Sequence, residues 1–417
     1  MTRYKIQATK HLDTTITLPP SKSISNRALI IHALSGGNSY PQNLSDCDDT
    51  DVIIKALQDM PYEIDIKAAG TAMRFMTAYL AVTEGEHVLT GTERMKHRPI
   101  EVLVNALRYL GADIEYVGEE GFPPLRIRGK TLDGGQIEVP GNISSQYISA
   151  LLMIGPTLQN GLELKMTGNI ISRPYIDLTL WTMREFGAKA DWVSGDTVMV
   201  YPSSYKQREY LIENDWSAAS YWYEMVALSR DENAIVHLNG LMDGSKQGDS
   251  VVRYIFSMLG VKTVFKSRKQ NTPTTVTLKK SGRVVPRLDY DFTNSPDLAQ
   301  TVVACCAALG VPFHFKGLST LKIKETDRIK ALCSEMRKVG MVLRVENDSE
   351  LIWDGERCDV SLLPIDTYED HRMALSFAPM SLRIDGIRIN DPMVVTKSYP
   401  AYWNDLQKAG FTIDKEG

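Results

Sequence analysis

Helices that end in a glycine and lead into a strand recur along the chain. In five places, apolar residues spaced as on one face of a helix are followed by a glycine and then by a strand-like run. A glycine just past a helix end takes up the left-handed conformation that closes the helix. These glycines are Gly111, Gly187, Gly260, Gly340 and Gly410, at spacings of 76, 73, 80 and 70 residues. A sixth, weaker copy covers residues 56–66.

A second set of helices lies between these copies, and each is opened by small or polar residues. We expect them to begin at Ser23, Gly70, Ser144, Ser217, Pro296 and Asp370, at spacings of 47, 74, 73, 79 and 74 residues. The pattern predicts six units of two helices and several strands, the first shortened by about 26 residues. A solenoid is the usual outcome of such a period, but irregular insertions and the lack of capping repeats favour two closed domains of three units each. The polar stretch at 201–213 is the expected crossover between the two halves.

Composition and charge narrow the classes of function. With 43% hydrophobic and 24% charged residues, the 417-residue chain is typical of a globular protein. The 47 basic and 51 acidic residues give a net charge of −4, so nucleic acid is not the expected principal partner. The longest uninterrupted apolar run, at 302–309, is too short to span a membrane, and the N-terminal residues lack the apolar stretch of a signal peptide. Five scattered cysteines without a CxxC pair predict a reduced, cytoplasmic protein without a structural metal.

The segment PPSKSISNRAL has the features of an anion-binding site. We expect Ser23 to cap a helix that runs to about Leu34, with Lys22 beside the free backbone N–H groups and Arg27 one turn further on. A cation, a hydroxyl group and the helix dipole would then converge on one point. The alternative is a capped surface helix that carries two solvated cations.

Two further helix starts carry groups of the same kind. Gly70 in AAGTAMR allows a ligand to approach the backbone closely, although a plain turn glycine fits equally well. Ser144, Ser145 and Gln146 crowd the first turn of another helix, where capping needs only one of them. Their hydroxyl and amide donors suit phosphate oxygens.

Charged residues at other helix starts complete the pattern. Arg98 and Arg173 each precede a proline at a helix start, where a cation is unfavourable unless an anion compensates it. In LKIKETDRI, we expect a strand before Glu325 and a helix start after it. Glu325 and Arg328 form either an ordinary surface pair or part of a site. The cations at helix starts are Lys22, Arg27, Arg98, Arg173, Arg328, Arg372 and Lys397. If these starts face a common cleft between two domains, the cleft binds a pair of polyanionic small molecules, and Asp297 and Glu325 are the acids placed for proton transfer.

Eight segments, in order from about residue 5 to residue 413, resemble one family. They are PSKSISNRAL, AGTAMR, RMKHRPI, SSQYISALLM, SRPYIDLTL, KETDRI, EDHRMAL and DPMVVTKSYP. Together they are similar to 5-enolpyruvylshikimate-3-phosphate synthases. The resemblance implies an α+β fold of two similar domains, each an inside-out barrel or prism of three βαβαββ units, with the ligands in the cleft between them. It also implies one domain of residues 1–20 plus 214–417 and a second of residues 21–213.

The reaction that the resemblance implies moves the enolpyruvyl group of phosphoenolpyruvate to the 5-hydroxyl of shikimate 3-phosphate, by addition and elimination with release of phosphate. This step of the shikimate pathway leads to chorismate and the aromatic amino acids. The resemblance implies no cofactor, no metal and no covalent enzyme intermediate. The implied partners are the two small molecules, without nucleic acid or membrane, and we expect a cytoplasmic monomer.

By the same resemblance, the site residues divide between the two substrates. The set expected to hold shikimate 3-phosphate is Lys22, Ser23, Arg27, Ser144, Ser145, Gln146, Ser172, Tyr175, Asp297 and Lys324. The set expected to hold phosphoenolpyruvate is Lys22, Gly70, Arg98, Gln146, Arg328, Arg372 and Lys397. Glu325 is expected to handle the proton at the methylene carbon, Asp297 the hydroxyl proton, and Lys22 a further proton.

The chain departs from the family pattern at three positions. Ala68 and Thr320 stand where the family usually has Asn, and Phe75 stands where it has Pro. The backbone at Gly70 still predicts that glyphosate competes with phosphoenolpyruvate.

Two alternatives to this function stay open. One is the UDP-N-acetylglucosamine enolpyruvyl transferase, which shares the architecture but typically has a Lys-Asn pair near its N-terminus, whereas Ser23 follows Lys22 here. The other is a non-catalytic protein that captures anionic metabolites, for which acids in the site are a disadvantage.

Overall fold

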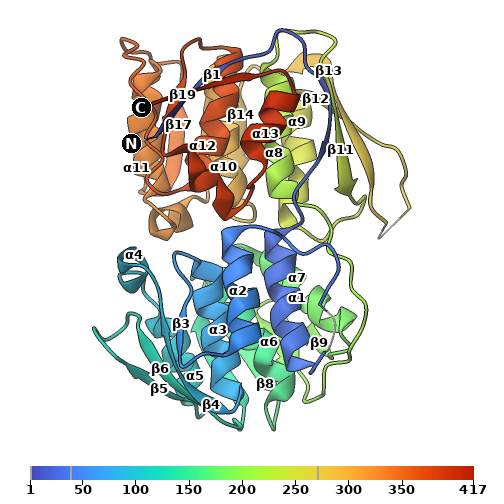
Figure 1. Cartoon of the computed structure of the whole chain (residues 1–417), viewed down its shortest axis with the longest axis vertical. Coiled ribbons are helices and arrows are strands. Elements are labelled where there is room, and N and C mark those ends of the chain that lie inside the picture. The colour runs from blue at the N-terminus through green and yellow to red at the C-terminus, as the bar shows by residue number, and fades with distance from the viewer. Residues whose placement is uncertain (1, 38–39, 270–271) are drawn as a thin grey trace. The chain divides into compact units, whose positions relative to one another are not determined.

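Backbone contacts divide the chain into two compact units. The computed structural model describes residues 2–37, 40–269 and 272–417. Unit 1 is Met1–Pro19 together with Glu213–Gly417, and unit 2 is Pro20–Ile212. Both ends of the chain belong to unit 1, where the blue N-terminal strand lies beside the red C-terminal one (Figure 1).

Unit 2 is built from short alternating helices and strands. Its elements are α1 (Lys22–Leu34), α2 (Asp48–Asp59), β3 (Glu63–Asp65), α3 (Gly70–Val82), β4 (Gly85–Thr90), α4 (Glu93–Lys96), α5 (Glu101–Tyr109), β5 (Asp113–Tyr116), β6 (Leu125–Gly129), β7 (Gly135–Pro140), α6 (Ser145–Ile154), the 3-10 helix η1 (Gly155–Thr157), β8 (Leu162–Thr167), α7 (Arg173–Glu185), β9 (Ala190–Trp192) and β10 (Thr197–Val200).

Unit 1 has the same alternation. Its elements are β1 (Arg3–Gln7), β2 (Asp13–Thr17), α8 (Trp216–Leu228), β11 (Ile235–Leu241), η2 (Gly248–Val251), α9 (Val252–Met258), β12 (Leu259–Phe265), β13 (Thr274–Val284), β14 (Leu288–Asp291), η3 (Pro296–Leu298), α10 (Ala299–Leu309), β15 (Phe313–Lys316), η4 (Ser319–Ile323), α11 (Arg328–Lys338), β16 (Arg344–Glu346), β17 (Glu350–Trp353), α12 (His371–Phe377), η5 (Ala378–Leu382), β18 (Arg388–Asn390), η6 (Pro392–Lys397), α13 (Tyr402–Lys408) and β19 (Thr412–Glu416).

Four sheets share one strand order, which confirms the expected repeat. The orders are β3-β4-β6-β5, β7-β8-β10-β9, β2-β11-β13-β12 and β14-β15-β17-β16. In each sheet the first two strands are parallel and the remaining pairs are antiparallel. In three sheets the connection between the parallel strands contains an α-helix, as a parallel pair requires. Between β2 and β11 the chain passes through all of unit 2 before it forms α8. Each sheet with its two helices is therefore one βαβαββ unit.

The two remaining repeats depart from this order. In unit 1, β1 lies between β18 and β19, so the N-terminal strand completes the C-terminal repeat. In unit 2, the described part of residues 20–62 contains α1 and α2 but no sheet, and Gln42 forms only a bridge with Leu211. The bridge shows where the polar stretch at 201–213 returns to the first repeat, which is the shortened one.

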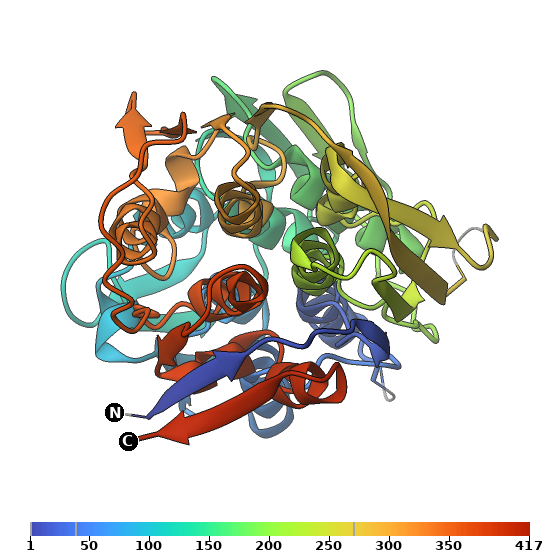
Figure 2. The ribbon, with the colours of Figure 1, turned by 90° about the horizontal axis from the view of Figure 1, so that it is seen from above.

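The core of each unit is a set of helices that are buried all round. In unit 1 these are α8, α10 and α12, seen end-on in Figure 2 with the strands outside them. In unit 2, nearly every residue of α3 and α6 is buried. A helix that is apolar on all sides must lie inside the protein, whereas strands that alternate buried and exposed residues cover a core with one face.

The helix ends agree with the glycine pattern, while three helix starts and one strand do not. The five repeat glycines have φ between 85° and 100°, and Met60 closes the sixth copy at φ 40°. Ser21, not Ser23, caps α1 by accepting from the Ile24 N–H at 3.4 Å, because the helix already begins at Lys22. Asp215 caps α8, two residues before the expected start at Ser217. The helix expected from Pro296 opens as η3, and the strand expected before Glu325 is the 3-10 helix η4.

Two glycines of unit 1 allow the energetic cost of backbone strain to be compared with the cost of steric overlap. Gly310 and Gly317 have φ of 77° and 73°, but a Cβ on Gly310 meets nothing within 4 Å, whereas one on Gly317 would overlap the Thr293 backbone nitrogen. Gly310→Ala should lower the free energy of unfolding by about 1–2 kcal/mol, the cost of a left-handed alanine. Gly317→Ala should cost about 2 kcal/mol more, because the backbone must also move. Urea unfolding checks both, and equal losses would contradict the overlap.

Candidate active site

A buried arginine gathers three carboxylates in unit 1. Arg328, the first residue of α11, is 1% exposed. Its Nε donates to Asp370 Oδ2 at 2.7 Å, its Nη1 to Asp297 Oδ1 at 3.1 Å, and its Nη2 to Glu325 Oε2 at 2.8 Å. The sequence pair Glu325–Arg328 is therefore part of a buried network and not an ordinary surface pair.

The three carboxylates keep Arg328 charged. Burial alone would lower the pKa of the Arg328 guanidinium, but Asp370, Glu325 and Asp297 more than offset that effect and raise the pKa above its ordinary value. A buried charge is tolerated in this way only when it is paired and hydrogen-bonded. The charged form of each group in this network is therefore stabilised by the opposite charges beside it.

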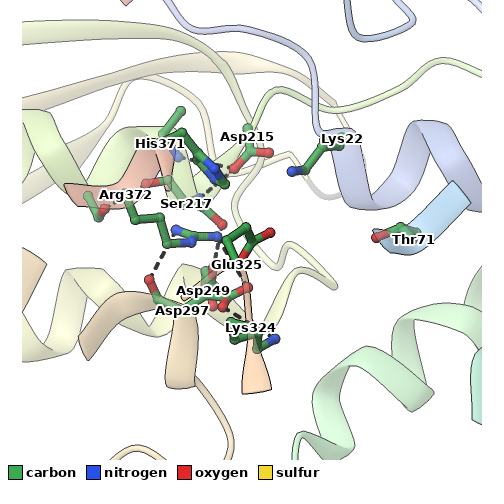
Figure 3. Close-up of polar contacts among 12 residues, drawn as sticks. Lys22, Thr71, Asp215, Ser217, Asp249, Asp297, Lys324, Glu325, His371 and Arg372 are labelled. Carbon is green, nitrogen blue, oxygen red and sulfur yellow. Dashed lines mark hydrogen bonds and ion pairs between the residues drawn. The ribbon is translucent and has the colours of Figure 1, made fainter. Parts of the chain in front are cut away.

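Asp297 is surrounded by three cations. Arg372 Nη2 lies 3.2 Å from its Oδ2, and Lys324 Nζ lies 3.7 Å from its Oδ1, on the opposite side from Arg372 in Figure 3. Burial raises the pKa of the Asp297 carboxyl, but Arg372, Lys324 and Arg328 together hold it well below its usual range. The carboxylate form is therefore strongly favoured as long as these cations face it.

One more cation completes this cluster, which we call the unit 1 cluster. Lys397 Nζ lies 3.5 Å from Glu325 Oε1. Arg372 donates through Nη1 to the Asp297 backbone oxygen at 3.0 Å and to Tyr221 Oη at 3.3 Å. Four cations and three carboxylates leave a formal excess of one positive charge (4 − 3 = 1). The members of the unit 1 cluster are Asp297, Lys324, Glu325, Arg328, Asp370, Arg372 and Lys397.

In unit 2, Lys22 and Arg27 have different surroundings. Lys22, the first residue of α1, pairs through Nζ with Asp49 Oδ2 at 3.0 Å. Arg27 is 3% exposed and donates to Thr179 Oγ1 at 2.7 Å and to the Ser23 backbone oxygen at 2.9 Å. Burial lowers the pKa of Arg27 to about 10, against an opposing effect of Tyr175, so it stays charged at neutral pH. The alternative of two solvated cations on a surface helix is therefore wrong for Arg27.

The starts of α6 and α7 lie near these groups. Arg27 Nη2 donates to Ser149 Oγ on α6 at 3.1 Å and to the Tyr175 backbone oxygen on α7 at 3.4 Å. Ser144 caps α6, as expected, by accepting from the Gln146 N–H at 3.4 Å. Ser172 precedes α7 at φ 55°, a left-handed conformation that is unfavourable for serine. Such backbone strain is found most often at functional sites.

Gly70 and Arg98 are in close contact in unit 2. A Cβ on Gly70 would lie 2.5 Å from Arg98 Nη1. Arg74 holds both segments, because it donates to the Gly70 oxygen at 3.1 Å and to the Pro99 oxygen at 3.0 Å. Gln146 Nε2 donates to Thr71 Oγ1 at 2.9 Å, which brings the start of α6 beside the start of α3.

Arg173 does not take part in such a site. Its guanidinium lies over the Trp192 ring, 3.8 Å from the ring centre, and its Nη1 donates to the Gly195 backbone oxygen at 2.8 Å. The expectation that an anion compensates this cation is wrong, because an aromatic face and a carbonyl do so.

Neither a metal site nor a membrane span appears among the residues that the structure describes. No three His, Cys, Asp or Glu side chains there are arranged to hold a metal ion. Within the same residues, no helix is both long and apolar enough to cross a membrane.

The comparisons with known proteins agree with the motif resemblance. A family model described as EPSP synthase (3-phosphoshikimate 1-carboxyvinyltransferase) matches residues 6–65 and 59–406. The chain belongs to the EPSP synthase family. A 3-phosphoshikimate 1-carboxyvinyltransferase of Bacteroides fragilis strain YCH46 is 58% identical over 412 residues, covering 99% of this chain and 98% of the relative. One from Aliivibrio fischeri strain MJ11 is 34% identical over 431 residues, covering 97% and 98%. The EPSP synthase of Acinetobacter baumannii has the same fold, with a TM-score of 0.79 at 21% identity and full coverage of both chains.

Sequence reasoning missed several partners that this member of the EPSP synthase family brings into the two sites. Asp49 pairs with Lys22. Asp249 is 3% exposed and accepts a hydrogen bond from the Ser217 hydroxyl, drawn in Figure 3. Thr71 accepts from Gln146. The sequence pattern could not predict these contacts, because a lone acid or hydroxyl group in a loop or first helical turn does not indicate which residue it will contact. Only the role of Asp215 as a helix cap could have been predicted, because it is an acid just before a helix that begins with small residues.

Asp249 gives the folded state a pH dependence. Burial and, to a smaller extent, the nearby Asp297 carboxylate raise the pKa of Asp249 from 3.8 to about 6, against an opposing effect of Arg372. Because the folded-state pKa exceeds the unfolded one, ionisation of Asp249 lowers stability as the pH rises from about 4 to about 6.

Asp249→Asn should remove this loss while keeping an oxygen that accepts from Ser217. The difference in the free energy of unfolding, variant minus wild type, should increase by up to about 2 kcal/mol between pH 4 and pH 7. Urea unfolding at four pH values measures the difference. A difference that stays constant across this range would show that Asp249 has an ordinary pKa.

Proposed function

We propose that the chain catalyses the reaction of the EPSP synthase family, the transfer of the enolpyruvyl group of phosphoenolpyruvate to the 5-hydroxyl of shikimate 3-phosphate. The family match and the names of the full-length relatives support this activity. The chain is thus a transferase of the shikimate pathway and of aromatic amino acid biosynthesis. The observation that carries the assignment in the structure is the unit 1 cluster, in which the two carboxylates Asp297 and Glu325 lie among four cations.

Both substrates are anions, and the proposed binding groups are donors and cations. For phosphoenolpyruvate, we assign Lys22, Gly70, Arg98 and Gln146 of unit 2 and Arg328, Arg372 and Lys397 of unit 1. For shikimate 3-phosphate, we assign Lys22, Ser23, Arg27, Ser144, Ser145, Gln146, Ser172, Tyr175, Asp297 and Lys324. Buried or partly buried cations interact strongly with phosphate and carboxylate groups, because little water screens them.

The same groups support the proton transfers. We assign to Glu325 the proton that adds to the methylene carbon of phosphoenolpyruvate, and to Asp297 the proton of the attacking 5-hydroxyl. The oxygen of that hydroxyl then bonds to the central carbon of the former enol. Return of a proton from the methyl group to the Glu325 carboxylate and departure of phosphate then restore the double bond in the product. Lys22 serves as a further proton carrier, and the arginines offset the charge of the departing phosphate.

The pKa of Asp297 fits a base that is activated by its substrates. Arg372, Lys324 and Arg328 hold this pKa well below its usual range. A carboxylate with such a low pKa is a weak base. The negative charges of bound phosphate and carboxylate groups would offset these cations, which raises the pKa of Asp297 when the hydroxyl is to be deprotonated.

Phosphate release in the presence of both substrates tests the proposal. Release should require phosphoenolpyruvate and shikimate 3-phosphate together. Release with UDP-N-acetylglucosamine in place of shikimate 3-phosphate would support the sister transferase instead. Tight binding of both anions without release would support a protein that only captures metabolites. Among the residues that the structure describes, no contact favours either alternative over the proposed reaction.

Removal of either proposed catalytic carboxylate should separate chemistry from binding. Asp297→Asn and Glu325→Gln should each lower kcat by about 10²–10⁴-fold, the range expected for loss of a general acid or base. Binding of phosphoenolpyruvate should be retained, because the variants lose negative charge beside cations. Phosphate release gives kcat, and calorimetric titration gives the affinity.

Asp289→Asn is the matched control for these variants. Asp289 lies in the same unit on the exposed surface, where it pairs with Arg287 at 2.9 Å. This variant should keep wild-type kcat. Wild-type kcat in Asp297→Asn or Glu325→Gln would remove that residue from the proposed mechanism.

Gly70→Ala should weaken phosphoenolpyruvate binding, because its Cβ would displace Arg98 from the position that lies 2.5 Å away. We expect the KM for phosphoenolpyruvate to rise about tenfold, an energy of about 1.4 kcal/mol, with the KM for shikimate 3-phosphate unchanged. Gly195→Ala is the control, since a Cβ there meets nothing within 4 Å. Competition of glyphosate with phosphoenolpyruvate stays a prediction. Steady-state inhibition measured at varied phosphoenolpyruvate concentration checks it.

A further inference from the structure

The segment of residues 366–370, which leads into the unit 1 cluster, is hydrogen-bonded to α11 at both of its ends. At one end, the Glu335 carboxylate of α11 accepts from the Asp366 backbone N–H at 3.0 Å and from Tyr368 Oη at 2.6 Å. At the other end, Arg328 of α11 donates from Nε to Asp370 Oδ2 at 2.7 Å. Glu335 is seven residues after Arg328, so the two anchors lie on the same face of the helix, two turns apart.

The backbone between the two anchors is strained. Tyr368 and Glu369 are consecutive residues in the left-handed region, with φ of 53° and 56°. Neither is a glycine, so each is held there against its own steric preference. Such a conformation persists only where surrounding contacts impose it. The residue that follows is Asp370, which binds Arg328 and also accepts from the Arg372 backbone N–H at 2.9 Å.

The hydroxyl group is the part of Tyr368 that is well anchored. The residue is 37% exposed, so its ring gains only part of the burial that usually holds a tyrosine in place. Glu335 is 0% exposed, and its carboxylate is itself fixed by Lys338 Nζ at 2.7 Å. Lys338 also pairs with Asp366 at 2.8 Å. The phenol therefore bonds to an acceptor that cannot move away with it.

We propose that Tyr368 is a positioning residue for phosphoenolpyruvate, because its hydroxyl bond to Glu335 holds Asp370 against Arg328 and at the start of α12. We call this contact the Tyr368–Glu335 latch. The inference rests on the function proposed above, which assigns Arg328 and Arg372 to phosphoenolpyruvate. Tyr368 itself touches neither substrate in this assignment. Its effect is on where two of the binding guanidinium groups stand.

The first test is Tyr368→Phe, which removes one oxygen atom and keeps the ring. The KM for phosphoenolpyruvate should rise about fivefold, the size expected for one hydrogen bond. The kcat should stay within about twofold, because misplaced binding groups weaken ground state and transition state alike. The KM for shikimate 3-phosphate should not change. An unchanged KM for phosphoenolpyruvate would overturn the proposal.

Tyr223→Phe is the matched control in the same unit. Tyr223 Oη bonds to Thr263 Oγ1 at 2.9 Å, and the residue is no part of the proposed site. Both variants lose a phenolic hydroxyl group that forms a hydrogen bond, and thermal unfolding compares their stability. If Tyr223→Phe raised the KM for phosphoenolpyruvate as much as Tyr368→Phe, the effect would be one of general stability, and the latch would be refuted.

A double-mutant cycle with Glu335→Gln tests whether the two residues act through one contact. Both changes weaken the same latch, so the double variant should raise the KM for phosphoenolpyruvate by clearly less than the product of the single effects. A full product would mean that Tyr368 and Glu335 act independently, which contradicts the proposal. Wild-type turnover in the same assay tests the proposed function separately, since the latch is judged only from ratios to wild type.

Discussion

The ion pairs of Arg328 join three segments of unit 1 that are far apart in the sequence. Its guanidinium contacts Asp297 in η3, Glu325 just before α11, and Asp370 at the start of α12. Breaking one partner of a buried ion pair typically costs about 3–5 kcal/mol, because the remaining charge is left uncompensated. The positions of these carboxylates are therefore mutually constrained. The rest of the unit 1 cluster is arranged around this fixed centre.

The carboxylates of the cluster explain how so many cations can stand together before any substrate binds. Lys324, Arg372 and Lys397 each lie within 4 Å of Asp297 or Glu325. Without those acids, the cations would repel one another in surroundings with little water. Substrate anions would take over part of this neutralising role, which frees the two acids for proton transfer. One set of groups thus serves folding and, in the proposed reaction, chemistry.

The repeat supplies the geometry that delivers these groups. Helices that are buried all round form the centre of each unit, and their first turns carry the polar side chains. The sheets pack outside them with one face toward the core. Left-handed residues occur where the chain turns into two of the helices, with Ser172 before α7 and the pair Tyr368 and Glu369 before α12. In both places the strained backbone directly precedes residues of the proposed sites.

Much of the fold was readable from the sequence, because its signals are local. A glycine that closes a helix acts within a few residues, and the repeat glycines accordingly have positive φ. The spacing of the repeats predicted six units of two helices and several strands, and four of the observed sheets share one strand order. Helix starts were predicted to within three residues. Ser21 and Ser23 flank Lys22, and because α1 already begins at Lys22, Ser21 is the cap. The 3-10 helix η4 was taken for a strand, since a short apolar run fits both.

The sequence by itself determined which chemical groups stand at the helix starts. The tertiary structure alone decided their partners. Asp49 faces Lys22 from another helix, Asp370 reaches Arg328 across 42 positions, and Arg173 lies on Trp192 instead of beside an anion. Each of these contacts depends on which buried helices and strands are neighbours. Periodicity along the chain reports only the face that a residue occupies, whereas a charge pairs with whatever the packed core brings within about 4 Å.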